Sequence, residues 1–161
     1  MKKVLMSLLL VCMVLAVASL PVYASKPTRV SGGFGYVPVC PEDEIELLGR
    51  NIFMHCEDTE IWTGGLVGTA TTEYWVIWHG EVLEGPATFS SKGQFVGSVG
   101  EDGEQGTAEF QVTGILKAGA EQWQGTWWMG QGTEGLENVH AQGTWEGSGP
   151  FTYEGLVHFA P

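Results

Sequence analysis

The stretch that decides the fold is Leu66–His79, which reads Leu-Val-Gly-Thr-Ala-Thr-Thr-Glu-Tyr-Trp-Val-Ile-Trp-His between flanking glycines. It is rich in threonine, valine and aromatic residues, the types that favour β-strands. Side chains alternate between the two faces of a strand, so one face carries Thr69, Thr71, Glu73, Trp75 and Ile77, and the other carries Ala70, Thr72, Tyr74, Val76 and Trp78. Both faces contain aromatic residues, and the pattern leaves open which face meets a core.

Runs of the same kind follow one another along the chain. They span Asn51–Trp62, Leu66–His79, Val82–Ser91, Gln94–Gly100, Gln105–Leu116, Glu121–Met129, Val139–Gly147 and Phe151–Phe159. The breaks between them, among them Lys92-Gly93 and a longer loop at Gly130–Asn138, have turn chemistry. Short connections favour antiparallel neighbours, and a meander of about eight strands avoids exposed edges most simply by closing on itself. We therefore predict an all-β, antiparallel, eight-stranded meander barrel over residues 50–161.

A four-residue motif occurs twice within these runs. Gln-Gly-Thr-Trp stands at Gln124–Trp127 and again at Gln142–Trp145. Glycine inside a strand marks a bulge or a tight bend, the device that lets a sheet curl. We interpret the motif as part of the barrel geometry; the alternative is a binding repeat.

The first 24 residues have the composition of a secretory signal peptide. Met1-Lys2-Lys3 precedes an apolar run from Val4 to Val17, and Val22 and Ala24 supply the small residues of a cleavage site. The alternative is an uncleaved membrane anchor, which needs roughly 20 apolar residues. We expect cleavage after Ala24, a secreted or periplasmic location, and no stable membrane insertion of the mature chain.

Residues 25–49 contain prolines, the Ser31-Gly32-Gly33 cluster and the acidic run Glu42-Asp43-Glu44, which predict an irregular arm or a loosely attached entry strand.

The net charge of the whole chain is −12. A chain this acidic is an unlikely partner for nucleic acid, because phosphate binding needs clustered Lys and Arg. Export makes a disulfide between Cys40 and Cys56 plausible, while two buried thiols are the alternative. No metal-binding motif accompanies them, and we expect neither metal nor cofactor.

Glycine-centred segments of the barrel region resemble bacterial domains of uncharacterised function that share the allene oxide cyclase-like barrel. The resemblance extends from about Thr59 to Phe159, and it rests on Gly64–Thr69 leading into Glu73–Trp75, on Gly106–Gly114, on Gly125–Trp127 and on the loop Gly130–Leu136. It departs from the family at Glu134 and at Asn138–His140. The resemblance implies a barrel with a central cavity and relatives that include cyclases and isomerases acting on apolar molecules. No catalytic residue of allene oxide cyclase matches a position here.

Aromatic residues on the predicted strands are the candidates for ligand binding, namely Trp62, Tyr74, Trp75, Trp78 and Trp127 together with Gln111. Tryptophans in a small barrel either fill the core or line a pocket for one small ligand, and both interpretations stay open. Glu73 and Glu109 are the candidate catalytic residues. An inward Glu73 beside aromatic residues would have a raised pKa and could move a proton, whereas an outward Glu73 would face water.

Three functions follow from these residues. The first is an exported barrel that binds a small apolar molecule or serves as an envelope domain. The second is a cyclase or isomerase without cofactor, in which Glu73 or Glu109 moves a proton. The third is a carbohydrate-binding module or a homo-oligomeric structural protein. The first two differ in what lines the cavity: an ionisable side chain at the bottom of an apolar pocket favours the enzyme, and a filled interior favours the binder.

Overall fold

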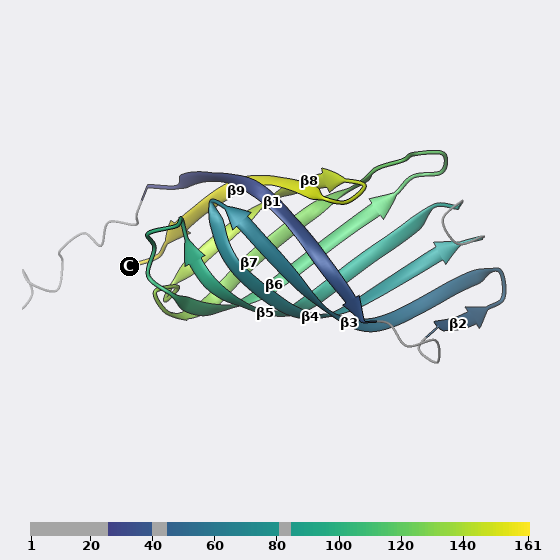
Figure 1. Cartoon of the computed structure of the whole chain (residues 1–161), viewed down its shortest axis with the longest axis horizontal. Coiled ribbons are helices and arrows are strands. Elements are labelled where there is room, and N and C mark those ends of the chain that lie inside the picture. Colours follow the sequence, from purple (N-terminus) through teal and green to yellow (C-terminus); the bar gives the residue numbers. More distant parts are fainter. Residues whose placement is uncertain (1–25, 40–44, 81–84) are drawn as a thin grey trace, which may run out of the picture.

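The computed structural model describes residues 26–39, 45–80 and 85–161, and antiparallel strands make up most of them (Figure 1). Their bounds are β1 (Thr28–Val39), β2 (Ile45–Leu48), β3 (Asn51–Gly64), β4 (Leu66–His79), β5 (Ala87–Val99), β6 (Gly106–Leu116), β7 (Trp123–Glu134), β8 (Val139–Gly147) and β9 (Phe151–Phe159). The described residues contain no helix that is long and apolar enough to cross a membrane. The all-β prediction is confirmed.

The sheet closes through β1. Strands are hydrogen-bonded in the order β1-β9-β8-β7-β6-β5-β4-β3-β2, and β1 also pairs with β3. Residues Thr28–Phe34 of β1 face β9, and residues Gly32–Val39 face Gly64–Glu57 of β3. Eight strands, β1 and β3 to β9, therefore form a closed barrel, while β2 pairs only with β3. The predicted eight-stranded meander barrel is confirmed.

Of the two alternatives for residues 25–49, the irregular arm is wrong for Thr28–Val39, which is a strand, and this strand is part of the barrel wall instead of being loosely attached. Val30 and Phe34 point inward and are buried in the core. Gly32, one of the glycines that suggested a loop, instead allows β1 to lie close to β3, because a Cβ on Gly32 would overlap the carbonyl oxygen of Thr63. Glycine content alone does not separate a loop from a tightly packed strand.

One predicted turn, Lys92-Gly93, lies inside a strand. Val82–Ser91 and Gln94–Gly100 are separate strands in the sequence-based prediction, but a single strand, β5, covers Ala87–Val99 and pairs with β4 across Lys92-Gly93. A Cβ on Gly93 would overlap the carbonyl oxygen of Thr71, so this glycine again allows close approach of two strands. The predicted count of eight barrel strands is therefore right only because β1 replaces one of this pair.

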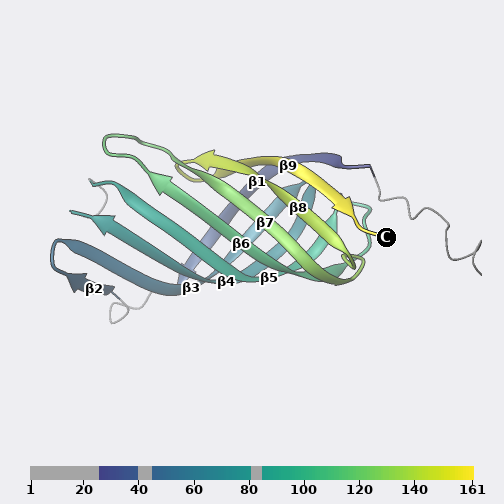
Figure 2. The ribbon, with the colours of Figure 1, turned by 180° about the vertical axis from the view of Figure 1, so that it is seen from behind.

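Aromatic side chains fill one half of the barrel. Phe34 stacks on Trp62 with ring centroids 4.4 Å apart, and Trp62 meets Phe110 edge-on at 5.0 Å. Tyr153 links β9 to β3 and β4 across β1, because its hydroxyl accepts a hydrogen bond from the Leu66 amide at 2.6 Å and donates one to the Thr63 carbonyl at 3.1 Å. We call this part the closed half; Figure 2 shows its outer wall from behind.

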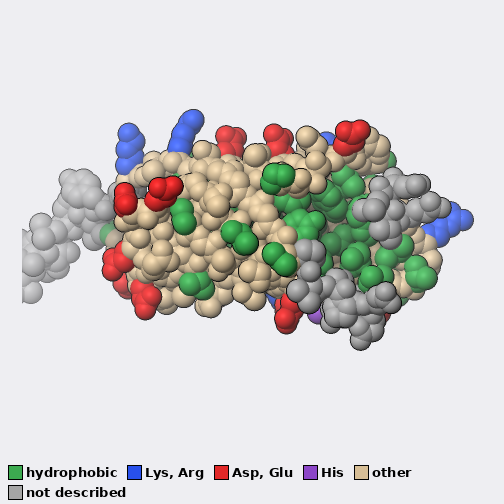
Figure 3. Space-filling view, in the orientation of Figure 1, with side chains coloured by type: hydrophobic (Ala, Val, Ile, Leu, Met, Phe, Trp, Pro, Cys, Tyr) green, Lys and Arg blue, Asp and Glu red, His purple; other side chains and the backbone are tan. Residues whose placement is uncertain are grey.

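The other half is bounded by fewer strands. Asn51–Met54 of β3 pair with β2 instead of β1, and the ends of β3 to β7 project beyond β1, β8 and β9 (Figure 1). We call this part the open half. Its inward side chains form a second apolar cluster, made of Cys56, Tyr74, Val76, Trp78, Ala87 and Leu116 with Ile52, Met54, Phe89 and Trp123 packed against it. Apolar side chains also gather on this half of the surface in Figure 3.

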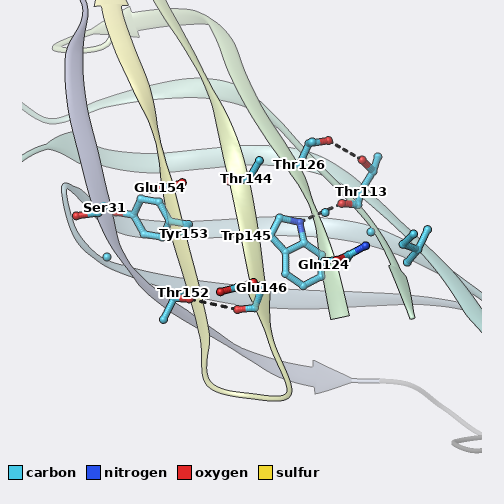
Figure 4. Close-up of a pocket in the computed structure, with 14 residues that line it drawn as sticks. Ser31, Thr113, Gln124, Thr126, Thr144, Trp145, Glu146, Thr152, Tyr153 and Glu154 are labelled. Carbon is cyan, nitrogen blue, oxygen red and sulfur yellow. Dashed lines mark hydrogen bonds between the residues drawn. The ribbon is translucent and has the colours of Figure 1, made fainter. Parts of the chain in front are cut away.

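The repeated Gln-Gly-Thr-Trp motif forms a reciprocal packing arrangement between β7 and β8. The ring of Trp145 fills the space that a Cβ on Gly125 would occupy, and the ring of Trp127 does the same at Gly143. Each indole also donates a hydrogen bond to a backbone carbonyl. Trp145 Nε1 donates to the Thr113 carbonyl at 3.0 Å (Figure 4), and Trp127 Nε1 donates to the Glu154 carbonyl of β9 at 3.3 Å. The interpretation of this motif as barrel geometry is supported.

Candidate functional site

The structure divides the predicted ligand-binding residues between the two faces of the wall. Tyr74 and Trp78 point into the open half, and Trp62 and Trp127 lie in the packed core of the closed half. Trp75 and Gln111 point outward. Trp62, Trp78 and Trp127 are therefore all buried in apolar clusters, and their role in ligand binding stays a prediction.

The predicted catalytic residues Glu73 and Glu109 are exposed on the outer face. Together with Gln111 they line a shallow external hollow of about 750 Å³, in which Glu73 lies opposite Lys92 of β5. Lys92 Nζ lies 5.1 Å from the ring centroid of Trp75. The inward orientation that a proton-transfer role for Glu73 requires does not occur.

Two other acidic residues do point into the barrel, Asp58 and Glu60 of β3. Their relative exposures are 6% and 2%. They alternate with the exposed Glu57 and Thr59, and they lie on the same face of β3 as the inward residue Trp62. The sequence contained this signal, since every second residue back from a core tryptophan must share its face, but Asp58 and Glu60 were not among the predicted site residues.

Hydrogen bonds hold both carboxyl groups. Glu60 Oε2 accepts from Trp62 Nε1 at 2.9 Å, and its Oε1 accepts from Ser91 Oγ at 3.2 Å. Asp58 Oδ1 accepts from Thr72 Oγ1 at 3.0 Å. The partners come from three adjacent strands, β3, β4 and β5. The polar side chains therefore form one layer across the inner wall, made of Asp58, Glu60, Thr72 and Ser91.

Burial disfavours the charged form of both groups. It raises the pKa of Asp58 from 3.8 to about 6, against the opposing hydrogen bond from Thr72. Burial also raises the pKa of Glu60 from 4.5 to about 7, aided by repulsion from Asp58 and opposed by the hydrogen bonds from Trp62 and Ser91. No described Lys or Arg lies inside to offset them, because all five are exposed. Both carboxyl groups therefore titrate near neutrality.

The polar layer lies between the two apolar clusters. Along β3 the inward residues run from Ile52, Met54 and Cys56 in the open half, through Asp58 and Glu60, to Trp62 in the closed half. Asp58 is next to the open half, and Glu60 is next to the packed core.

The same architecture exists in a solved protein. The barrel is similar to that of a protein of unknown function from the DUF3224 family of Shewanella oneidensis, with a TM-score of 0.69 over 84% of this chain and 99% of that chain. The two sequences are 20% identical, so the likeness concerns the fold alone. No family model matches this chain, and no curated protein matches it in sequence. The specific resemblance to the allene oxide cyclase-like barrel stays a prediction.

Metal binding and the disulfide are separate questions. Within residues 26–39, 45–80 and 85–161, no group of three or more His, Cys, Asp or Glu side chains is arranged to hold a metal ion. Cys56 is buried beside the open half. Its predicted disulfide partner, Cys40, lies outside the described residues, so the disulfide stays a prediction.

Proposed function

We propose that the open half binds a small, largely apolar molecule whose one polar group meets Asp58. The observation that supports this most is the position of a buried carboxyl layer next to the apolar, aromatic-rich cluster of the open half. Ligand sites typically combine mostly apolar walls with a few polar groups that fix orientation. A carboxyl group that titrates near neutrality accepts a hydrogen bond in one form and donates one in the other, so the preferred polar group is a hydroxyl or an amine.

The walls of the open half suit a planar or ring-containing molecule. Trp78 meets Trp123 edge-on with ring centroids 5.8 Å apart, and Tyr74 lies 6.1 Å from Phe89. Aromatic rings in such arrangements offer both faces and edges to an apolar guest. Closed packing around Trp62 stops the molecule at the carboxyl layer.

Titration with N-phenyl-1-naphthylamine, a neutral apolar fluorophore with one N–H donor, tests the proposal. We expect probe emission to rise on binding and tryptophan emission to fall. Trp78→Ala should weaken binding about tenfold or more, since truncating a well-packed aromatic contact costs more than about 1.4 kcal/mol. Ile61→Ala, at an exposed outward position of β3, is the matched control and should bind like the wild type. Equal affinity in the wild type and Trp78→Ala would place the probe elsewhere.

Asp58→Asn separates the role of the carboxyl group from that of the walls. For a probe with a protonated amine, such as 1-naphthylmethylamine, the substitution should lower affinity, because the ionised Asp58 no longer offsets its charge. For 1-naphthalenemethanol the loss should be small, because an amide oxygen still accepts a hydrogen bond. Identical losses for both probes would show that Asp58 does not contact the ligand.

A second candidate is an isomerase or cyclase without cofactor, and the pKa values of the carboxyl pair favour it. A general acid or base is most effective when its pKa lies near the working pH, and those of Asp58 and Glu60 are raised to about 6 and about 7. One carboxylate would take a proton from a carbon of the substrate and return it to another, so that no atom is gained or lost. With a substrate in hand, Glu60→Gln should abolish turnover while binding remains; retained turnover would exclude this role.

The location of the protein remains our proposal as well. We propose that it is exported and that the mature chain begins at Ser25, which the mass of the secreted form tests. Thiol labelling of denatured, unreduced protein tests the proposed bridge between Cys40 and Cys56. Rapid labelling of both cysteines would exclude the bridge.

A further inference from the structure

The outer wall of the barrel carries three neighbouring hollows. The first has a volume of about 1050 Å³ and crosses β6, β7, β8, β9 and β1 (Figure 4). The second, of about 860 Å³, crosses β7, β8, β9 and β1. The third, of about 750 Å³, lies over β3 to β7 and contains the exposed Glu73 and Glu109.

Two of these hollows lie over pairs of glycines that pack on internal tryptophans. In the first, Gly114 and Gly125 face each other across β6 and β7, and the ring of Trp145 lies against both from the inside. In the second, Gly143 and Gly155 face each other across β8 and β9, with the ring of Trp127 behind them. These glycines occupy inward positions of their strands, so the indoles fill the space that their side chains would take, and the outward residues of the same strands line the hollows.

The hollows join into one groove. Thr126, Thr144, Ser31 and Glu154 line both the first and the second hollow. Trp128 lines both the second and the third. A continuous surface therefore runs from Glu146 at one end, past Trp128, to Glu73 at the other. We call it the outer groove.

Trp128 lies flat within the outer groove. Its side chain is 37% exposed, and a Cβ on Gly130 would stand 2.5 Å from its Cζ2 and 3.0 Å from its Cη2. The six-membered ring therefore lies over the backbone of Gly130 instead of projecting into solvent. An indole held in this way offers an apolar surface to a flat molecule.

Hydroxyl and amide groups surround this indole. Gln142 lines the second hollow and Gln111 the third, and both are exposed. The hydroxyls of Thr113 and Thr126 are 3.0 Å apart and hydrogen-bonded, so they are already oriented along the wall (Figure 4). The groove thus offers hydrogen-bond donors and acceptors around one exposed aromatic ring, and it crosses several strands.

We propose that the outer groove binds a neutral oligosaccharide chain. Sugar rings combine an apolar face, which stacks on an indole, with hydroxyls that both donate and accept hydrogen bonds. Five acidic side chains outnumber the two basic ones, Arg29 and Lys92, along the groove, which disfavours anionic polysaccharides and nucleic acid; the five are Glu57, Glu73, Glu109, Glu146 and Glu154. The site is separate from the open half and does not depend on a ligand there.

Affinity electrophoresis in native gels cast with hydroxyethyl cellulose, xylan or galactomannan tests this proposal. We expect at least one of these neutral polymers to retard the wild-type protein, and the acidic polymer alginate to leave its migration unchanged. Trp128→Ala should reduce the affinity for the retarding polymer about tenfold, the effect of losing a stacking contact of about 1.4 kcal/mol. Gln142→Ala should weaken retardation less.

Val96→Ala is the matched control, because Val96 is exposed on the outer face but lies in none of the hollows. It should migrate like the wild type, and urea unfolding should show that each variant is folded. Migration of the wild type unaffected by all three neutral polymers overturns the proposal. Equal retardation of folded Trp128→Ala and the wild type also overturns it.

Discussion

Replacing Glu60 by Gln should change how stability depends on pH. The folded protein binds the Glu60 proton more tightly than the unfolded chain does, because burial raises the pKa from 4.5 to about 7. The protonated carboxyl therefore contributes stability that is complete below about pH 4.5 and is lost as the pH rises through about 7. Each tenfold difference in proton affinity between the folded and unfolded chains corresponds to about 1.4 kcal/mol, so the loss amounts to about 3 kcal/mol.

Glutamine keeps the shape of the side chain and stays neutral at every pH. Its oxygen can still accept from Trp62 Nε1, and its amide can donate to Ser91 Oγ. We expect Glu60→Gln and the wild type to have similar free energies of unfolding near pH 4.5. Near pH 8 the variant should be more stable by up to about 3 kcal/mol. Only the smaller decline from Asp58, whose pKa is raised to about 6, should remain in the variant.

Urea unfolding followed by tryptophan fluorescence, repeated between about pH 4.5 and about pH 8.5 at constant ionic strength, measures this difference. Glu73→Gln is the matched control, since it neutralises an exposed carboxyl group on the adjacent strand. The control should keep the slope of the wild type. Parallel stability curves for the wild type and Glu60→Gln would refute the assignment of Glu60 as a buried acid with a raised pKa.

Three further substitutions test the packing of the barrel. Tyr153→Phe removes the acceptor of the Leu66 amide, and leaving that buried donor unpaired should cost about 1–3 kcal/mol in urea unfolding. Gly125→Ala places a methyl group on the carbonyl oxygen of Thr113, so a drop in melting temperature is expected in thermal unfolding by circular dichroism. Phe34→Ala removes the main contact of β1 with the core, and a loss of about 3–5 kcal/mol in the free energy of unfolding is expected.

Matched controls for these substitutions lie at less buried positions of β1. Tyr36→Phe removes a hydroxyl from a half-exposed ring and should leave stability nearly unchanged. Gly35→Ala adds a methyl group where nothing lies within 4 Å, so it should be tolerated. A large loss in either control would mean that the losses in the test variants do not come from the contacts of Tyr153, Gly125 and Phe34.

The strand pattern and the closed topology could be predicted from the sequence because alternation and turn chemistry are local properties. Leu66–His79, Val139–Gly147 and Phe151–Phe159 have the predicted bounds in the structure. Glycine caused the two main errors. At Gly32 and Gly93 it allows two strands to approach closely, and the sequence does not distinguish this use from a turn.

The carboxyl layer was missed for a different reason. Charged residues are rarely fully buried unless they are paired, so nothing in the local sequence marked Asp58 and Glu60 as inward residues, and Glu73 was chosen for its aromatic neighbours. Which face of a strand points inward depends on how that strand packs against strands far away in the sequence. The burial of Trp62 identifies the inward face of β3 in the structure, but from the sequence alone this burial was only one of two alternatives.

The double pairing of β1 bears on how the chain folds. Its partners are β3 and the last strand, β9, so the ring closes only when residues from both ends of the chain are present. Contacts so distant in sequence slow folding, because a large loop must close before they form. Until β9 has been synthesised, the edges of β1 and β8 stay open to other chains. The chain therefore completes its barrel only when β9 becomes available.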